Sequence, residues 1–420
     1  MVNYFLSQNS PFTVLDIGSG KICCLIAKLD KQNKINILGA GFQESKGIVS
    51  GSITDMKKLE SSIRDCLASA EKMASIRVKD IILGFSSVSS SSEVFSIEID
   101  LKGSIIGKAD LEKSYEYLYN KLNLENRTIL HVIPVQFSID GNKGIKDPLG
   151  MYGNKLGLEV SIISTDTNIL RNFKSLIKKC DLEVRDIIFS AYSLGHSVLT
   201  EEEKDLGTAV VDIGAELTSV SIFLYGELVF TNTIPIGGNL VTKDISKIFS
   251  LALSDSERIK IINGQLIEEL ENSLSIIEVG TLGGENFNDS TEITRRELIS
   301  VIKPRIIEII DSINDKIKNS GYDHIIANRL VITGGVSQTD GLIELIQNIS
   351  NKKARLARAK IINNIPENMR NSSFSVINSL LHFTVSENND IKINKKSINL
   401  NSQGLYNNFL KFKNWFYENF

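Results

Sequence analysis

Two segments of this chain repeat one pattern, and the repeat constrains the fold more than any other feature. Residues 14–21 read VLDIGSGK, and residues 210–217 read VVDIGAEL. In each copy a short apolar run ends in Asp and Gly, which predicts a buried strand entering a tight turn that presents a carboxylate and bare backbone amides. Two such copies favour two related halves that face each other across a cleft.

The residues after each turn predict a second strand. Ile22–Ala27 is a small-apolar run, and after a polar turn the strand pattern resumes at Ile35–Leu38; Val220–Leu224 is followed in the same way by Leu228–Thr231. Each loop therefore joins strand to strand within a β-meander. This connectivity excludes a P-loop and a dinucleotide-binding fingerprint, because the glycine turn opens a helix in both of those motifs.

A pair of strand-loop-strand turns, each with an Asp, suits a nucleotide held from both sides. We expect the two carboxylates to hold hydrated Mg²⁺, mainly through water, while backbone amides of both loops cradle the phosphates. Taken singly, each turn would be a plain hairpin. The residues that we expect to bind the cofactor in these loops are Asp16, Gly18, Ser19, Gly20, Lys21, Asp212, Gly214 and Thr218.

A third glycine turn strengthens the nucleotide hypothesis. Residues 330–337 read LVITGGVS, a buried strand that ends in Gly334 and Gly335, and an apparent helix follows from about residue 341 to residue 349. The two glycines would let the backbone approach a flat ligand closely. Three glycine turns in the order phosphate, phosphate, adenosine resemble those of the actin, Hsp70 and sugar-kinase superfamily, which implies ATP and Mg²⁺ in a central cleft.

Composition indicates a large protein with no nucleic-acid partner. A chain of 420 residues is too long for one core and should form at least two domains. The net charge of -3 lacks the basic excess typical of nucleic-acid binding. We expect the four cysteines to be reduced core residues. No segment reaches the roughly 18 apolar residues of a spanning helix, and no signal peptide is visible, so we expect a cytoplasmic protein.

The order of the predicted elements gives a domain organisation. A helix over Met56–Ala74 belongs to the first half, which we expect at residues 1–80 and 165–205, with a subdomain inserted at residues 81–164. The second half is expected at residues 206–234 and 303–385, with a smaller subdomain at 235–302. A flexible linker is expected at 386–402.

Several longer segments make the resemblance more specific. Residues 131–140 (HVIPVQFSID) and 144–150 (GIKDPLG) look like the inserted subdomain of the FtsA family, the actin-like proteins of bacterial cell division. Residues 197–207, 235–245 and 302–305 continue the match in the correct order. The resemblance implies an α/β actin-like ATPase fold of two halves around a nucleotide cleft, and by superfamily analogy it adds to the nucleotide site Gly237, Gly238, Glu257 and Lys260.

The resemblance also implies a role and partners. Members of this family bind the C-terminal tail of the tubulin-like protein FtsZ, polymerise in an ATP-dependent way, recruit later division proteins and act on the cytoplasmic side of the inner membrane at the division site. Three arginines lie in or beside the smaller subdomain of the second half, where the family docks the FtsZ tail: Arg295, Arg296 and Arg305.

The C-terminal residues 403–420 predict an amphipathic helix that lies on a membrane. Apolar residues at steps of three or four share one face, and the polar stretch before them offers little to pack on. Such a helix would place its aromatic side chains at the level of the lipid headgroups, as the FtsA resemblance also implies. The residues expected to contact the membrane are Leu405, Phe409, Phe412, Trp415, Phe416 and Phe420.

The second phosphate loop departs from the family pattern. Where relatives commonly carry Gly-Gly-Gly-Thr, this chain has Gly214, Ala215, Glu216 and Leu217. A carboxylate beside polyphosphate would be repelled, unless Glu216 points away or binds the Mg²⁺; Thr218 or Ser219 could replace the missing hydroxyl. We expect weak or slowly turned-over nucleotide and see no catalytic base. Two alternatives remain, a sugar or acetate kinase of the superfamily and an actin-like scaffold of a pilus-assembly machine.

Overall fold

The computed structural model describes residues 10–122, 125–267, 275–280, 290–326, 328–358, 360 and 362–386. The predicted membrane helix at 403–420 and the linker from residue 387 onwards lie outside the described residues. In the part of the chain that is described, no helix has the length and apolar character needed to cross a membrane.

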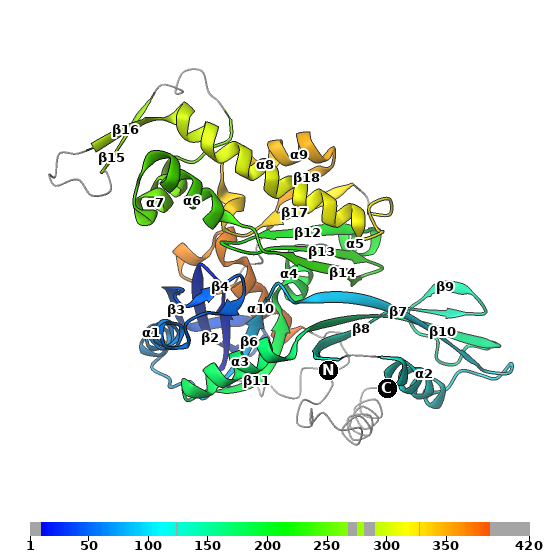
Figure 1. Cartoon of the computed structure of the whole chain (residues 1–420). Helices are drawn as coiled ribbons and strands as arrows, with labels where there is room; N and C mark the ends of the chain where they lie inside the picture. The colour runs from blue at the N-terminus through cyan, green and yellow to red at the C-terminus, as the bar shows by residue number, and fades with distance from the viewer. Residues whose placement is uncertain are drawn as a thin grey trace.

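The first half is built on a five-stranded sheet in the order β11-β6-β1-β2-β3 (Figure 1). The predicted meander forms as β1 (Phe12–Ile17), β2 (Lys21–Leu29) and β3 (Ile35–Glu44), all antiparallel. The parallel strands β6 (Asp80–Phe85) and β11 (Glu183–Phe189) extend the sheet beyond β1. The strand at residues 81–85, expected to open the insert, therefore lies in the first sheet.

Helix α1 (Met56–Ala74) has the predicted bounds and covers this sheet, after a short hairpin of β4 (Ile48–Val49) and β5 (Ser52–Ile53). Two glycines of β3 let the helix approach: a Cβ on Gly39 or Gly41 would lie 2.2 Å from a backbone carbonyl oxygen of α1. Burial of the apolar face of α1 then follows from the helical spacing of Leu59, Ile63, Cys66, Leu67 and Ala70.

The insert has its own core. It comprises the strands β7 (Ser91–Asp100), β8 (Arg127–Ile139), β9 (Asn142–Ile145) and β10 (Lys155–Asp166), with one covering helix, α2 (Lys108–Lys121). Leu111, Tyr115 and Leu118 of α2 pack into an apolar cluster with the strands. Helix α3 (Thr167–Lys179) then returns the chain to the first half.

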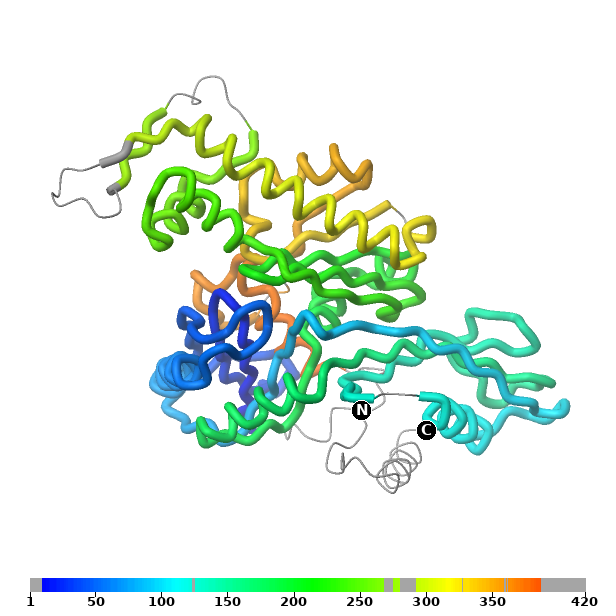
Figure 2. Tube along the Cα trace, viewed as in Figure 1, coloured from blue at the N-terminus to red at the C-terminus, as the bar shows by residue number. Residues whose placement is uncertain are grey.

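The insert's sheet continues the sheet of the second half. The second meander comprises β12 (Thr208–Ile213), β13 (Thr218–Leu224) and β14 (Glu227–Ile234), and β17 (Arg329–Thr333) and β18 (Lys353–Leu356) lie beyond β12. The nine-stranded order is β18-β17-β12-β13-β14-β7-β10-β8-β9, and the tube in Figure 2 shows how the long insert strands extend from this half. The backbone pairing at the junction is slight, with one register pair between Asn232 and Ser91 and a 2.7 Å bond from the Thr231 amide to Ser92 Oγ. Val135 of β8 adds an apolar contact with the core of the second half.

The remaining helices surround the second half and the junction. The smaller subdomain carries α6 (Gly238–Phe249), α7 (Leu253–Asn263) and the hairpin of β15 (Ile276–Gly280) and β16 (Ser290–Thr294); α8 (Arg295–Asn319) crosses from it onto the second sheet. A 3-10 turn at Gly335–Gln338 and α9 (Leu342–Ser350) follow β17, where a helix was predicted.

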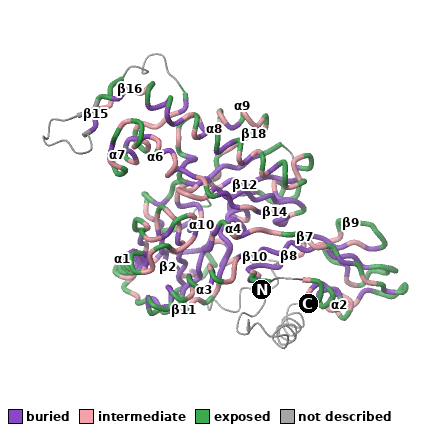
Figure 3. Tube along the Cα trace, viewed as in Figure 1, coloured by how far each residue is buried: buried purple, intermediate pink, exposed green. Residues whose placement is uncertain are grey.

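Two helices pack together between the halves, α4 (Ser190–Val198) and α10 (Ser375–Val385), while α5 (Glu201–Leu206) leads into β12. The hydroxyls of Ser193 and Ser379 lie 3.0 Å apart, and the Tyr192 and Phe383 rings are in edge contact. Although α10 follows the second half in sequence, it joins the core of the first half (Figure 3). All four cysteines are buried and free, as predicted.

Candidate nucleotide site

The two Asp-Ile-Gly loops have the same backbone turn and lie against each other. In the first loop the Gly18 amide donates to the Lys21 carbonyl at 3.0 Å, and in the second the Gly214 amide donates to the Leu217 carbonyl at 2.9 Å. A Cβ on Gly20 would lie 2.8 Å from the Ala215 Cβ, so the loops touch across the junction of the halves. The repeat in the sequence thus becomes a facing pair of turns.

A glycine on the neighbouring parallel strand makes room for each carboxylate. A Cβ on Gly84 of β6 would lie 3.2 Å from Asp16 Oδ1, and a Cβ on Gly334, after β17, would lie 2.5 Å from Asp212 Oδ1. Gly334 was predicted to belong to the site, whereas Gly84 was missed. The sequence could have indicated Gly84, because it follows the apolar run Ile81–Leu83 in the same way that Gly334 follows the apolar strand β17.

Burial and mutual repulsion dominate the electrostatics of the two carboxyls. Burial raises the pKa of Asp16 to about 7, with the Asp212 charge adding to the effect and Lys21 opposing it. Burial raises the pKa of Asp212 to about 6, again against Lys21. Within the described residues, no hydrogen bond or ion pair neutralises either carboxylate. Two half-buried carboxylates whose oxygens have no hydrogen-bond or ion-pair partner in the described residues suit a hard divalent cation such as Mg²⁺.

Other predicted residues of the first loop divide into two groups. The Ser19 hydroxyl is buried and has no hydrogen-bond partner among the described residues, so it is free to donate to a phosphate. The Lys21 ammonium instead lies 3.5 Å from the centroid of the Phe374 ring, and burial lowers its pKa. No group of three or more His, Cys, Asp or Glu side chains arranged for direct metal ligation occurs in the described part of the chain.

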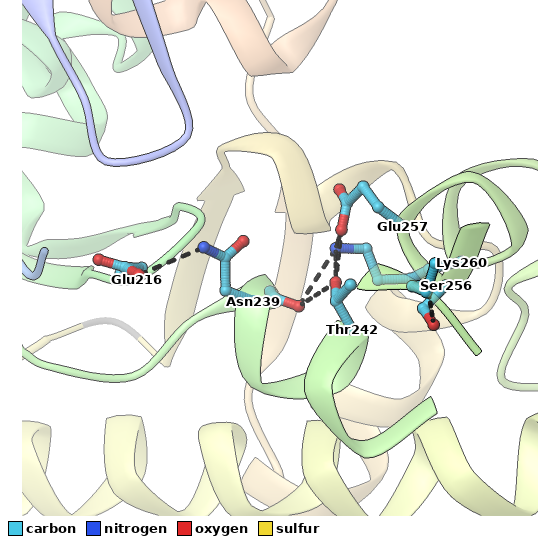
Figure 4. Close-up of polar contacts among 8 residues, drawn as sticks. Glu216, Asn239, Thr242, Ser256, Glu257 and Lys260 are labelled. Carbon is cyan, nitrogen blue, oxygen red and sulfur yellow. Dashed lines mark hydrogen bonds and ion pairs between the residues drawn. The ribbon is translucent and has the colours of Figure 1, made fainter. Parts of the chain in front are cut away.

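Glu216 is turned away from the facing loops. Its Oε2 accepts a hydrogen bond from the Ser50 amide at 2.7 Å, and its Oε1 lies 3.4 Å from Nδ2 of Asn239 (Figure 4). Ser50 belongs to the β4–β5 turn of the first half, so the carboxylate joins the second phosphate loop to the opposite half. Of the arrangements considered from the sequence, the structure selects the one in which Glu216 points away.

The N-terminus of α6 packs on the second loop. The Gly238 amide donates to the Gly214 carbonyl at 2.9 Å, and the Asn239 amide donates to the Ala215 carbonyl at 2.7 Å. A Cβ on Gly237 would lie 2.5 Å from that Gly214 oxygen, so glycine is required for this contact. Thr218, considered as a replacement hydroxyl, donates instead to the Ile236 carbonyl at 2.8 Å.

Glu257 and Lys260 lie next to Gly238 but are paired with each other. The Lys260 ammonium lies 2.6 Å from Glu257 Oε2 and also donates to the Gly238 carbonyl at 3.1 Å and the Thr242 hydroxyl at 2.8 Å (Figure 4). All three ammonium protons are therefore used: two bonds join α7 to α6, and the third pairs Lys260 with Glu257 of its own helix. Burial lowers the pKa of Lys260, and the Glu257 charge opposes that shift. Their contact with ribose and adenine stays a prediction.

The third glycine turn completes the arrangement. Gly334 has a φ of 90°, and a Cβ there would lie 2.4 Å from the Ile213 carbonyl oxygen. A Cβ on Gly238 would lie 2.8 Å from Val336 Cγ2, so the turn at Gly334 and Gly335 lies between the second loop and α6. The structure thus brings together the three glycine turns that the sequence singled out.

The three arginines lie on α8, apart from these loops. Arg305 is ion-paired with Asp244 of α6 at 2.7 Å and with Glu308, while Arg295 donates to Gln265 Oε1 at 3.0 Å. Arg296 is exposed. Sequence reasoning missed the exposed apolar side chains that the same subdomain carries on α6 and α7, namely Ile248, Leu253, Ile261 and Ile262.

Two meandering halves around facing Asp-Ile-Gly turns define an actin-like protein, and solved structures support that class. The chain aligns with the PilM-PilN type IV pilus biogenesis complex at a TM-score of 0.64 and 14% identity, covering 90% of this chain and 99% of that one. It aligns with MreB5 of Spiroplasma citri bound to ADP at a TM-score of 0.52 and 15% identity, and the alignment covers 90% of this chain and 97% of that one. At such identities the likeness shows the fold alone.

Sequence comparison gives the family. The family model described as cell division protein FtsA matches residues 209–379, and the SHS2 domain inserted in FtsA matches residues 88–164. The FtsA protein of Buchnera aphidicola is 31% identical over 99% of this chain and 100% of its own length. The FtsA protein of Agrobacterium fabrum is 31% identical over 88% of this chain and 86% of its own length. The FtsA protein of Escherichia coli K12 is 28% identical over 88% of this chain and 89% of its own length. The chain belongs to the FtsA family of cell division proteins, which confirms the predicted family and fold.

The raised carboxyl pKa values predict a pH-dependent stability. Protonation of Asp16 and Asp212 favours the folded state, so this stabilisation is present below their unfolded pKa and is lost as pH rises through 6 to 7. In nucleotide-free and magnesium-free protein, Asp212→Asn should therefore melt a few degrees above wild type at pH 8, with the difference shrinking towards pH 5. The control is Asp65→Asn on the exposed face of α1. A difference that stays constant with pH would contradict the account.

The Glu216 bond predicts a local change in amide exchange. Glu216→Ala should raise the hydrogen-exchange rate of the Ser50 amide about tenfold, since a bond to a charged acceptor contributes about 1.5 kcal/mol or more. Glu216→Gln should give a Ser50 exchange rate between those of wild type and Glu216→Ala. Asn239→Ala removes only the 3.4 Å contact and should change the Ser50 rate little. Exchange measured by NMR or mass spectrometry checks this, and an unaltered Ser50 rate in Glu216→Ala would exclude the bond.

Proposed function

We propose that this division protein is a nucleotide-gated adaptor, which tethers FtsZ filaments to the inner face of the cytoplasmic membrane and polymerises there with ATP bound. The observation that carries the proposal is the facing pair of loops with two half-buried carboxylates that no ion pair within the described residues neutralises. A polyphosphate with Mg²⁺ supplies the positive charge that this arrangement needs and anions that the loop amides can bind. Because both halves contribute a loop, a bound nucleotide would hold them together.

In this proposal the chain's own groups bind rather than react. The amides of Ser19 and Gly20 and the Ser19 hydroxyl would hold phosphate oxygens, while Asp16 and Asp212 would face hydrated Mg²⁺; the Gly18 and Gly214 amides are used within their own turns. Glu216 is the nearest further carboxylate of the second loop, yet it accepts bonds from Ser50 and Asn239 and is turned away. A carboxylate engaged in this way is poorly placed to activate water. We therefore propose weak or absent ATP hydrolysis.

We propose that the FtsZ tail docks on the subdomain of α6, α7 and α8. An acidic and apolar peptide requires exposed positive charge beside exposed apolar surface, and this subdomain supplies Arg296 together with the apolar side chains of α6 and α7. Arg305 is already paired with Asp244, so its contribution would be to hold α8 against α6. Among the three arginines, Arg296 is therefore the leading candidate for direct contact with the peptide.

Attachment to the membrane is proposed to come from residues 403–420. Their aromatic face follows from the sequence, and the described chain ends at Ser386 after α10. An amphipathic segment of this kind binds by burying apolar area in the headgroup region. Nucleotide-dependent filaments would then bring many such segments to one membrane patch, where their weak affinities multiply.

Vesicle flotation tests the attachment. The full chain should float with vesicles that contain anionic lipid, and a chain ending at Ser402 should stay at the bottom of the gradient. Phe412→Glu in the full chain should reduce flotation, because it puts a charge on the apolar face, whereas Asn407→Glu on the polar face should have a much smaller effect. Equal flotation of the full and shortened chains would refute the adaptor role.

A peptide titration tests the partner surface. Arg296→Glu should weaken binding of an FtsZ C-terminal tail peptide at least fivefold in fluorescence anisotropy, more at low salt than at high salt. Ile262→Asp should weaken it at both salt concentrations, and Lys72→Glu on the distant α1 should have no effect. Arg305→Glu should lower the melting temperature as well as the affinity. Unchanged affinity in Arg296→Glu and Ile262→Asp would reject this surface.

A further inference from the structure

A cavity of about 420 Å³ lies between the halves, at the end of the sheet opposite the nucleotide loops. Its walls include the β2–β3 turn, which is at the other end of the β1–β2 ladder from the loop at residues 18–20. The other walls are the C-terminal ends of α4 and α10, helix α5, and the chain around residues 360–363. We call this space the hinge cavity, because α4 and α10 form its inner end. The argument uses six of its lining residues: Lys34, His196, Glu201, Lys204, Lys360 and His382.

Lysine side chains line the hinge cavity on three of its walls. Lys34 comes from the β2–β3 turn, Lys204 from α5 and Lys360 from the segment before α10. The Lys204 residue is only 5% exposed, and the salt bridge that its ammonium makes is with Glu201, at 2.7 Å. That Glu201 side chain is 84% exposed, so an anion entering the cavity could replace it beside Lys204 at little cost.

Two imidazoles add hydrogen-bonding capacity to the same space. The Nε2 atoms of His196 and His382 are buried, and neither has a hydrogen-bond partner in the described part of the chain. Burial lowers the pKa of His196 to about 3, with Lys204 and Lys360 adding to the shift. Burial lowers that of His382 to about 4, again assisted by Lys360. Both rings are thus neutral; burial is the main cause of each shift, and the positive charge of the lysines adds to it.

Acidic groups reduce this positive potential only partly. Apart from Glu201, the carboxylate that faces His196 is Glu227 of β14, with Oε2 at 3.8 Å from Nε2. Three lysines therefore outnumber two carboxylates around the two neutral rings. Apolar surface from Ile35, Phe383 and Val385 lines the remainder of the cavity. A space of this size exceeds what a bare inorganic ion fills and is within the range of small-molecule sites.

We propose that the hinge cavity is a binding site for a small phosphate ester, with the phosphate held by Lys204 and Lys360 beside the two imidazoles and the organic group against Phe383 and Val385. The site is separate from the nucleotide loops but connected to them. Helix α4 begins directly after β11, whose Ile188 pairs with Gly84, and α10 begins directly after Phe374, which lies under Lys21. An occupant would contact the far ends of both helices.

The four histidines of the chain provide the test. The full-length protein is labelled with ¹⁵N-histidine, and His→Gln variants assign the side-chain resonances. The resonances of His196 and His382 are then followed while each of two probes is added. Pyrophosphate represents a free phosphate compound, and short-chain phosphatidylglycerol below its micelle concentration represents a lipid headgroup. Both resonances should shift saturably with at least one probe, and the probe that acts at the lower concentration identifies the source. The exposed His324 should not shift.

Charge variants separate this site from the nucleotide loops, which pyrophosphate could also enter. Lys360→Gln, an exposed and therefore tolerant position, should raise the midpoint of the titration at least fivefold, and Lys204→Gln should abolish saturation. Lys72→Gln on α1 should leave the midpoint unchanged. The proposal is overturned if neither probe moves the two resonances up to about 10 mM, where affinities are already negligible. It is also overturned if Lys360→Gln and Lys204→Gln both titrate as wild type.

Discussion

The structure depends on one electrostatic constraint, the burial of two like-charged carboxylates where the halves meet. Each Asp is the second-last residue of a central strand and lies next to a glycine of the adjacent parallel strand or the turn after it: Gly84 in one half and Gly334 in the other. Burial of an unpaired carboxylate is costly unless the group is protonated or neutralised. The raised pKa values of Asp16 and Asp212 reflect this cost. A cation between the loops would offset it, which is the physical basis of the proposed nucleotide and Mg²⁺ site.

Local patterns predicted those parts of the fold that depend on neighbouring residues. Strand-loop-strand turns at Asp16 and Asp212 and the helix at Met56–Ala74 follow from periodicity and turn chemistry, so they could be predicted. The pairing of strands that are far apart in the sequence could not be predicted in this way. The apolar run Ile81–Phe85 suits a buried strand in either domain, and only its register with β1 and β11 assigns it to the first sheet. The direction of Glu216 was equally inaccessible, because its partner Ser50 belongs to a turn of the other half.

The position of the insert adds a mechanical consequence. Its covalent connections run to β6 and α3 of the first half, whereas its sheet hydrogen-bonds to β14 of the second. The backbone ladder there is one register pair and one side-chain bond, in contrast to the long β7–β10 and β8–β10 ladders inside the insert. Side chains add to it, because Val135 of β8 packs in the core of the second half and Ile133 of the same strand packs in the core of the first. Any rotation of the halves must therefore change the contacts of the insert with at least one of them.

The two phosphate loops are related but no longer equivalent, and the difference bears on what the cleft can do. The first loop keeps a free Ser19 hydroxyl and three small residues, which is compatible with phosphate binding. The second uses its Glu216 carboxylate to bind the β4–β5 turn, so part of the contact between the halves exists without any nucleotide. A ligand can shift the equilibrium between open and closed states only by its differential affinity for them. Because the Glu216–Ser50 bond already joins the two halves, less of a ligand's affinity would be needed to hold them together.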